Sequence, residues 1–205
     1  EKILNKIFKL FSIEKNIEIS IEANPSELEK NRIFELKELG FNRISIGVQC
    51  LNNKDLNFLG RTHKIKDVHD ILEEAHKYFK NISADLIYAL VCQNIKTWEK
   101  ELVEFIENYQ LQHISAYQLT LEKGTKFYDL HKKGKFSLAN DNKYNKFYSA
   151  TKDILSEYNI SQYEVSNFSK PNFQSEHNKI YWKSENWIGI GPGAVSRLWD
   201  NKNDR

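Results

Sequence analysis

Four polar side chains near the ends of expected strands are the residues of this 205-residue chain best suited to chemistry. Glu22 ends a strand expected over residues 17–22, Gln49 ends one over residues 43–49, and Asp85 lies in a third over residues 82–88. Arg61 follows the second strand in a loop. Carboxylates suit a pair of ribose hydroxyls or an ammonium group, and a guanidinium pairs with a carboxylate through two parallel hydrogen bonds. For Arg61, the alternative is an ordinary ion pair on a surface loop.

A second candidate site is His177, in the aromatic-rich segment SEHNKIYW, close in sequence to Tyr181, Trp182 and Trp187. A neutral imidazole is a common axial ligand of heme iron, and aromatic side chains suit a porphyrin face. The alternative is a half-buried histidine that is hydrogen-bonded within an aromatic tail. Cys50 and Cys92 are 42 residues apart and show no metal-ligand spacing, so we expect two inert thiols.

The alternation of residues within the expected strands indicates which side chains share a face. If the isoleucines of the first strand point to covering helices, Glu22 points to the opposite face. The same phase turns Gln49 and Asp85 to that face in the next two strands. In a β/α barrel, ligand-binding residues collect on the inside, toward the C-terminal ends of the strands. The alternative is an antiparallel sheet whose polar face meets only solvent.

The elements that position these residues follow a regular rhythm. The segment SELEKNRIFELKELG opens with a capping box, Ser26-x-x-Glu29, and ends at Gly40, which predicts a helix. Apolar residues recur with helical spacing over residues 68–79 and 98–109, and residues 113–121 form a fourth expected strand. Strand starts separated by roughly 30 to 40 residues indicate βαβ units in a parallel sheet. We expect residues 1–121 to form this α/β part and residues 122–205 to form a smaller α+β region.

Composition narrows the functional classes. A formal net charge of +2 without a basic stripe argues against nucleic acid as a partner. The apolar runs are shorter than the ~18 residues that a membrane-spanning helix needs. Two cysteines form no disulfide framework and fit a reducing, cytoplasmic compartment. The chain opens on Glu1 and contains no methionine, so we expect a fragment of a longer protein.

Several motifs occur together in a specific order. They are IEANPSEL, GFNRISIGVQC, LGRTH and ADLIYAL, followed by QYEVSNFSKPNFQSEHNKIYW and WIGIGPGAVS. In this order and spacing they resemble the oxygen-independent coproporphyrinogen III oxidase-like radical S-adenosylmethionine (SAM) family, nearest its heme-chaperone branch, which is marked by HNxxYW. The resemblance covers nearly the whole chain. It implies a partial radical SAM β/α (TIM-like) barrel that lacks its first strands, followed by the smaller C-terminal region.

The resemblance also implies roles for residues and ligands. Glu22, Gln49, Arg61 and Asp85 are expected to contact SAM, and His177 to bind heme. The intact protein is expected to bind heme and transfer it to an acceptor protein that the sequence does not identify, with SAM and a [4Fe-4S] cluster as cofactors; a homodimer is compatible with the sequence. The alternatives are a radical SAM enzyme that oxidises coproporphyrinogen III, and a non-functional remnant. We favour the chaperone, which is not an enzyme, because of the HNxxYW segment.

The chain also departs from the family pattern. The CxxxCxxC loop whose thiolates hold the [4Fe-4S] cluster is absent, so no metal ligands are expected in this chain. Where relatives read GLPGQ after the third strand, this chain has the segment Ala89–Gln93, ALVCQ. Loss of the glycines and the proline removes the residues that such a turn ordinarily uses. Val195 stands where histidine is usual.

Overall fold

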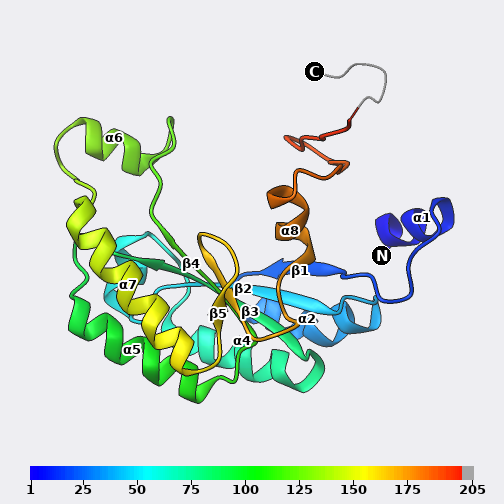
Figure 1. Ribbon diagram of the computed structural model, residues 1–205, viewed down its shortest axis with the longest axis horizontal. Helices are drawn as coiled ribbons and strands as arrows, with labels where there is room; N and C mark the ends of the chain where they lie inside the picture. Colours follow the sequence, from blue (N-terminus) through cyan, green and yellow to red (C-terminus); the bar gives the residue numbers. More distant parts are fainter. Residues whose placement is uncertain (200–205) are drawn as a thin grey trace. The chain divides into compact units, whose positions relative to one another are not determined.

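The computed structural model describes residues 1–199 (Figure 1). The chain forms two compact units, residues 1–173 and residues 174 onward. The strands of the first unit are β1 (Ser20–Ala23), β2 (Arg43–Gln49), β3 (Asn81–Tyr88), β4 (His113–Gln118), β5 (Ser161–Gln162) and β6 (Asn167–Ser169). Its helices are α1 (Lys2–Leu10), α2 (Glu27–Glu38), α3 (Asn53–Phe58), α4 (Ile65–Tyr78), α5 (Ile95–Asn108), α6 (Lys126–Lys132) and α7 (Asp141–Glu157). The second unit contains α8 (Glu176–Trp182).

The described strands form one mixed sheet in the order β1-β2-β3-β4-β6-β5. Strands β1 to β4 are parallel to one another, and β6 runs antiparallel to both β4 and β5. Each parallel connection contains a helix, as a crossover requires. The predicted α/β class is therefore confirmed, and the alternative of an antiparallel, solvent-facing sheet is wrong.

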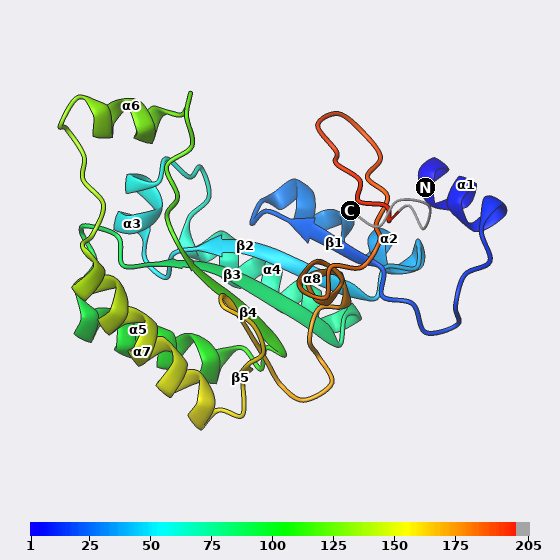
Figure 2. The ribbon, with the colours of Figure 1, turned by 45° about the horizontal axis from the view of Figure 1, so that its top comes forward.

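One face of the sheet carries the hydrophobic core. Helices α4, α5 and α7 lie along this side of β2–β4 (Figure 2), and α2 packs against α4. Buried side chains from the strands and from all four helices form a single cluster that includes Ile33, Ile46, Leu72, Leu102 and Phe147. Periodicity predicts α4 and α5, and in both helices the apolar stripe is buried.

Helix α2 begins and ends as the sequence predicts. The Ser26 side chain accepts a hydrogen bond from the Glu29 backbone N–H at 3.2 Å, and Gly40 follows the C-terminus with a φ of 96°. Glu27 and Glu29 lie in the first turn, where their charges stabilise the helix dipole. Capping residues thus fix both ends of this helix.

The first strand is shorter than predicted, since β1 begins at Ser20 and not at residue 17. The Asn42 side chain explains this difference. Its amide oxygen accepts a hydrogen bond from the Ile19 N–H at 2.8 Å, and its amide nitrogen donates to the Ile17 carbonyl at 2.7 Å. A side chain therefore satisfies backbone groups that a neighbouring strand would otherwise pair.

Residues 122–173 belong to the same compact unit as the parallel strands. Helix α7 packs against α5, and β6 extends the sheet beside β4, with Phe168 opposite Ile114. The boundary at residue 121 remains a prediction drawn from the change in sequence pattern. Among the described residues, no helix is long and apolar enough to span a membrane.

Candidate functional site

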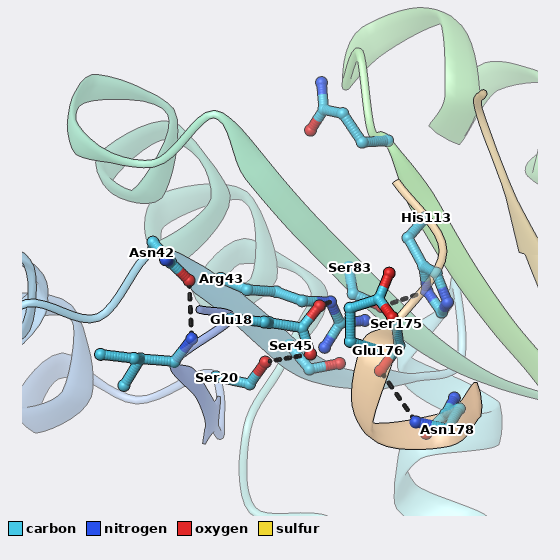
Figure 3. A network of polar contacts seen from close by, with 12 residues as sticks. Glu18, Ser20, Asn42, Arg43, Ser45, Ser83, His113, Ser175, Glu176 and Asn178 are labelled. Carbon is cyan, nitrogen blue, oxygen red and sulfur yellow. Dashed lines mark hydrogen bonds and ion pairs between the residues drawn. The ribbon is translucent and has the colours of Figure 1, made fainter. Parts of the chain in front are cut away.

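The face of the sheet opposite the hydrophobic core is polar. In register, Glu22 of β1 lies beside Ser45, Ser45 beside Ser83, and Ser83 beside His113. Residues that pair in register share a face, and side chains two positions apart along a strand do as well. Glu22 and Asp85 therefore lie on the same face, as their strand phase predicts. We call this surface of β1–β4 the polar face; part of it is drawn in Figure 3.

Asp85 lies near the centre of the polar face and is held by neighbouring strands. The Ser45 hydroxyl contacts its two carboxylate oxygens at 3.1 and 3.2 Å, and Ser115 also forms a hydrogen bond with it. Burial raises the pKa of Asp85, the two serines lower it, and the negative charge of Glu22 raises it further. Two hydroxyl donors from the neighbouring strands thus fix the position of this carboxylate.

Gln49 is buried at the end of β2, next to an irregularity in the pairing of β2 with β3. Its side-chain oxygen accepts a hydrogen bond from the Tyr117 hydroxyl at 3.1 Å. Burial raises the pKa of Tyr117 to about 12, and the charges of Asp85, Arg61 and Glu22 also act on this hydroxyl. Of the four predicted residues, Gln49 contacts Tyr117 directly, while Glu22, Arg61 and Asp85 are near enough for their charges to act on its hydroxyl; Glu22 and Arg61 are exposed to solvent.

Sequence analysis missed Tyr117 as a part of this surface. Tyr117 is two residues after Ser115 in β4, so extending the strand phase to the fourth strand would have found it. His63 follows Arg61 in the loop after α3 and is buried, with its Nε2 atom 3.2 Å from the Val48 carbonyl oxygen. No local pattern in the sequence indicates that contact, because it joins a loop to a strand.

A second group of residues lies on the same face. His113 is fully buried; its Nδ1 atom is 2.7 Å from the Ser83 hydroxyl (Figure 3), and its Nε2 atom is 2.8 Å from the Tyr163 hydroxyl. Burial first, and then the positive charge of Arg43, lower the pKa of His113 to about 3. The imidazole is therefore neutral near pH 7 and connects β3, β4 and the segment after β5.

Four buried polar atoms on this face have no hydrogen-bond partner among the described residues: Arg43 Nε, Asn81 Oδ1, Asn167 Oδ1 and Ser169 Oγ. In register, Asn81 lies beside Arg43, Asn167 opposite Ser115, and Ser169 opposite His113. Buried polar groups are ordinarily satisfied by protein, water or a ligand. The unpaired polar atoms of this face would therefore be satisfied by water or by a hydrophilic ligand, and not by an apolar one.

The cysteines do not fit an iron–sulfur cluster. Cys50 is fully buried, and burial raises the pKa of its thiol far above the usual range. Burial and a 3.1 Å hydrogen bond to Asp55 raise the pKa of Cys92 to about 11. Cluster ligation requires several deprotonated thiols close together. Within residues 1–199, no group of three histidine, cysteine or carboxylate side chains is arranged to hold a metal ion.

The turn after β3 lacks the family's glycines and proline and is held by contacts from elsewhere in the chain. Ala89 adopts a positive φ of 58°, a conformation that disfavours a residue with a Cβ atom. The ammonium group of Lys143 in α7 donates to the carbonyls of Leu90, Val91 and Gln93 at 2.6, 3.1 and 2.8 Å. A charged side chain from a distant helix thus holds this turn.

The second unit carries His177 on α8. The imidazole is exposed and forms an edge-to-face contact with Tyr181, one helical turn further on, with ring centroids 4.8 Å apart. Tyr181 in turn contacts Trp187 at 4.4 Å. Trp187 and Arg197 form a backbone bridge, so residues 187–197 fold back on themselves. The structure places the imidazole at an exposed position of α8, whereas the alternative interpretation of the sequence had a half-buried histidine.

Comparison with known proteins identifies the family. The radical SAM superfamily model matches residues 1–106. This match covers about half of the chain, and the chain belongs to the radical SAM superfamily. Within it, the chain falls in the branch of HemW-like heme chaperones and of radical SAM domain-containing protein 1.

Two relatives in this branch illustrate the similarity. The heme chaperone HemW of Lactococcus lactis is 39% identical over 97% of this chain and 52% of its own length. The mitochondrial radical S-adenosyl methionine domain-containing protein 1 of Danio rerio is 38% identical over 96% of this chain and 44% of its own length. The chain thus spans about half the length of these curated relatives.

A solved structure supports the fold. The radical SAM enzyme coproporphyrinogen III oxidase (HemN) of Escherichia coli superposes with a TM-score of 0.76, covering 95% of this chain and 48% of that one at 20% identity. At this identity the likeness concerns the fold alone. The prediction of a partial radical SAM β/α barrel is confirmed.

Proposed function

We propose that this chain is the part of a heme chaperone that binds SAM on the polar face of its sheet and heme through His177. The observation that carries the SAM site is the shared polar face of Glu22 and Asp85, together with the hydrogen bond from Tyr117 to Gln49; the charges of Glu22, Arg61 and Asp85 all act on the same tyrosine hydroxyl. Carboxylates at Glu22 and Asp85 suit the ribose hydroxyls or the ammonium group, and Arg61 suits the carboxylate. The relatives support the choice of ligand, because SAM is the defining ligand of their superfamily.

The heme-binding part of the proposal rests on α8. Its His177 imidazole supplies a nitrogen to an approaching iron, while Tyr181 and Trp187 supply aromatic surface beside it. The chaperone is preferred to an oxidase because the Lactococcus lactis relative, at 39% identity, is named a heme chaperone. The likeness to coproporphyrinogen III oxidase is one of fold. We infer that the intact protein hands the heme to an acceptor protein in a reducing compartment.

Bound SAM would be held by this chain's side chains, whereas a cluster would need thiolates that the chain does not contain. SAM with a cluster supplies radical chemistry in this superfamily. In a chaperone, the polar face only binds and orients the ligand. Asp85, fixed by Ser45 and Ser115, orients the ribose or amine, and Arg61 neutralises the carboxylate.

Calorimetric titration of the chain with SAM tests the first half of the proposal. Asp85→Asn should weaken binding at least tenfold, about 1.4 kcal/mol, because it removes a charged acceptor. Glu27→Gln is the matched control, because it also removes one negative charge, from the first turn of α2. Equal affinity of Asp85→Asn and the wild type would refute the site. No binding by the wild type would refute SAM binding by this chain and favour the remnant.

Heme titration followed by Soret absorbance tests the second half. His177→Ala should weaken heme binding at least tenfold and shift the Soret maximum, because the iron loses an axial nitrogen. His131→Ala removes an exposed histidine from α6 and should leave binding unchanged. Thermal melts of both variants show whether the chain stays folded. Unchanged heme affinity in a folded His177→Ala variant would overturn the assignment.

A further inference from the structure

Gln49 is held in a strained backbone conformation. Its φ is 69°, in the left-handed region, and the Cys50 N–H donates to the Val48 carbonyl across it at 2.9 Å. This i to i+2 hydrogen bond with a positive central φ defines the rarer, strained form of γ-turn. The Val48 carbonyl also lies 3.2 Å from the buried Nε2 atom of His63. Strain of this kind persists only where surrounding contacts fix it, and it is concentrated at functional sites.

The side chain of Gln49 is fixed as well as its backbone. The Tyr117 hydroxyl donates to Oε1 at 3.1 Å. Tyr117 itself lies opposite Ile87 in the β3–β4 register and packs against the small apolar cluster formed by Cys50, Leu56, Ile87 and Leu90. Because this cluster holds the tyrosine ring, the hydroxyl has a defined position relative to the end of β2.

Gly47 provides the space in which the amide lies. A Cβ atom at this position would come within 2.8 Å of Gln49 Nε2 and 3.3 Å of Asn24 Oδ1. Gly47 does not have a positive φ, so its backbone accepts alanine. The glycine is needed because the end of the Gln49 side chain packs directly over it, and an alanine there would push the amide away.

We propose that Gly47 and Tyr117 are positioning residues that fix the Gln49 carboxamide so that it offers its Nε2 N–H groups to an acceptor on SAM. With Oε1 occupied by Tyr117, the amide presents a donor to the ligand. The side chain therefore selects ligands with a carboxylate, hydroxyl or ring-nitrogen acceptor at this point. This inference rests on the proposed SAM site and adds the two residues that set its geometry.

Double-mutant cycles on SAM affinity, measured calorimetrically with the full chain, test the inference. Tyr117→Phe removes one hydroxyl and should raise the Kd about fivefold or more, which corresponds to one lost hydrogen bond. Gly47→Ala should raise the Kd similarly by displacing the amide. In a Gln49→Ala background, which itself weakens binding, both effects should vanish because no carboxamide remains to be positioned. Gln49→Glu should bind no better than Gln49→Ala, because it replaces the donor with an acceptor.

Tyr158→Phe is the matched control, since it also removes a tyrosine hydroxyl that donates one hydrogen bond, to Glu107 at 2.7 Å. It should leave the SAM affinity unchanged. Equal loss of affinity from Tyr117→Phe in the wild-type and Gln49→Ala backgrounds would show a general structural role and overturn the inference. Undiminished affinity in Tyr117→Phe would also overturn it. Absence of SAM binding by the wild type would instead refute the proposed SAM site itself, and this inference with it.

Discussion

Acidification should destabilise the first unit through His113. This imidazole is fully buried between the Ser83 and Tyr163 hydroxyls, and a neutral ring donates through one nitrogen and accepts through the other. Protonation would place a positive charge in a site without solvent, close to Arg43. Burial first, and that charge second, lower the pKa of His113 from its ordinary 6.5 to about 3.

The sign and size of the effect follow from this difference in pKa. The unfolded chain takes up a proton below pH 6.5, whereas the folded chain does not until about pH 3. The neutral histidine therefore contributes stability that is fully present above pH 6.5 and is lost as the pH falls toward 3. Each pH unit in this window costs up to about 1.4 kcal/mol. Between pH 7 and pH 5, the free energy of unfolding should fall by about 2 kcal/mol from this group alone.

Urea unfolding at pH 7, 6 and 5 measures this loss. In His113→Gln the contribution of about 2 kcal/mol should be missing from the pH dependence, although the variant is less stable at pH 7 by about 1–3 kcal/mol. Burial also lowers the pKa values of His63 and His76, and both effects cancel in the difference between the two proteins. His131→Gln, at an exposed position, should change the stability by less than about 0.5 kcal/mol.

Two results would refute this reasoning. Parallel loss of stability in the wild type and in His113→Gln would mean that His113 does not carry the pH dependence. An NMR titration of the folded wild type gives a direct check that does not depend on the variant. Protonation of the His113 ring near pH 6.5 would contradict the burial that the structure gives it.

Three further predictions follow from other contacts. The buried Trp98 indole N–H donates to the Thr151 hydroxyl at 2.9 Å. Thr151→Val should therefore lower the free energy of unfolding in urea by about 1–3 kcal/mol, and Thr151→Ser by less. Equal losses in the two variants would contradict this. Asn159 follows α7 with a φ of 60°. Asn159→Ala should therefore lower the free energy of unfolding by about 1 kcal/mol, and Asn159→Gly should hardly change it. Unchanged stability in Asn159→Ala would argue against this cap. At pH 7, native Cys50 should not react with a thiol reagent, and Cys92, with a pKa of about 11, should react slowly. Anaerobic reconstitution of the chain should not load a stoichiometric [4Fe-4S] cluster. Rapid reaction of both thiols, or a full complement of iron and sulfide, would contradict this prediction.

Much of the fold could be predicted from local sequence. The period-2 pattern gave the bounds of β2 correctly and the shared face of Glu22 and Asp85, because side chains alternate strictly along a strand. Ser26 and Gly40 marked the ends of α2, because capping depends on neighbouring residues alone. The SAM and heme roles of the predicted residues stay predictions.

Contacts between distant segments decided the rest. The Asn42 side chain pairs with the backbone before β1, residues of β6 pair with residues of β4 more than 50 positions away in sequence, and Lys143 donates to carbonyls of the turn after β3. Tyr117 forms a hydrogen bond with Gln49, which is 68 positions earlier in the sequence. The sequence by itself determined the face on which Glu22 and Asp85 lie, since alternation depends on the geometry of a single regular strand. Only the tertiary structure decided which side chains touch, because the strand register and the packing of helices depend on residues far apart in the chain.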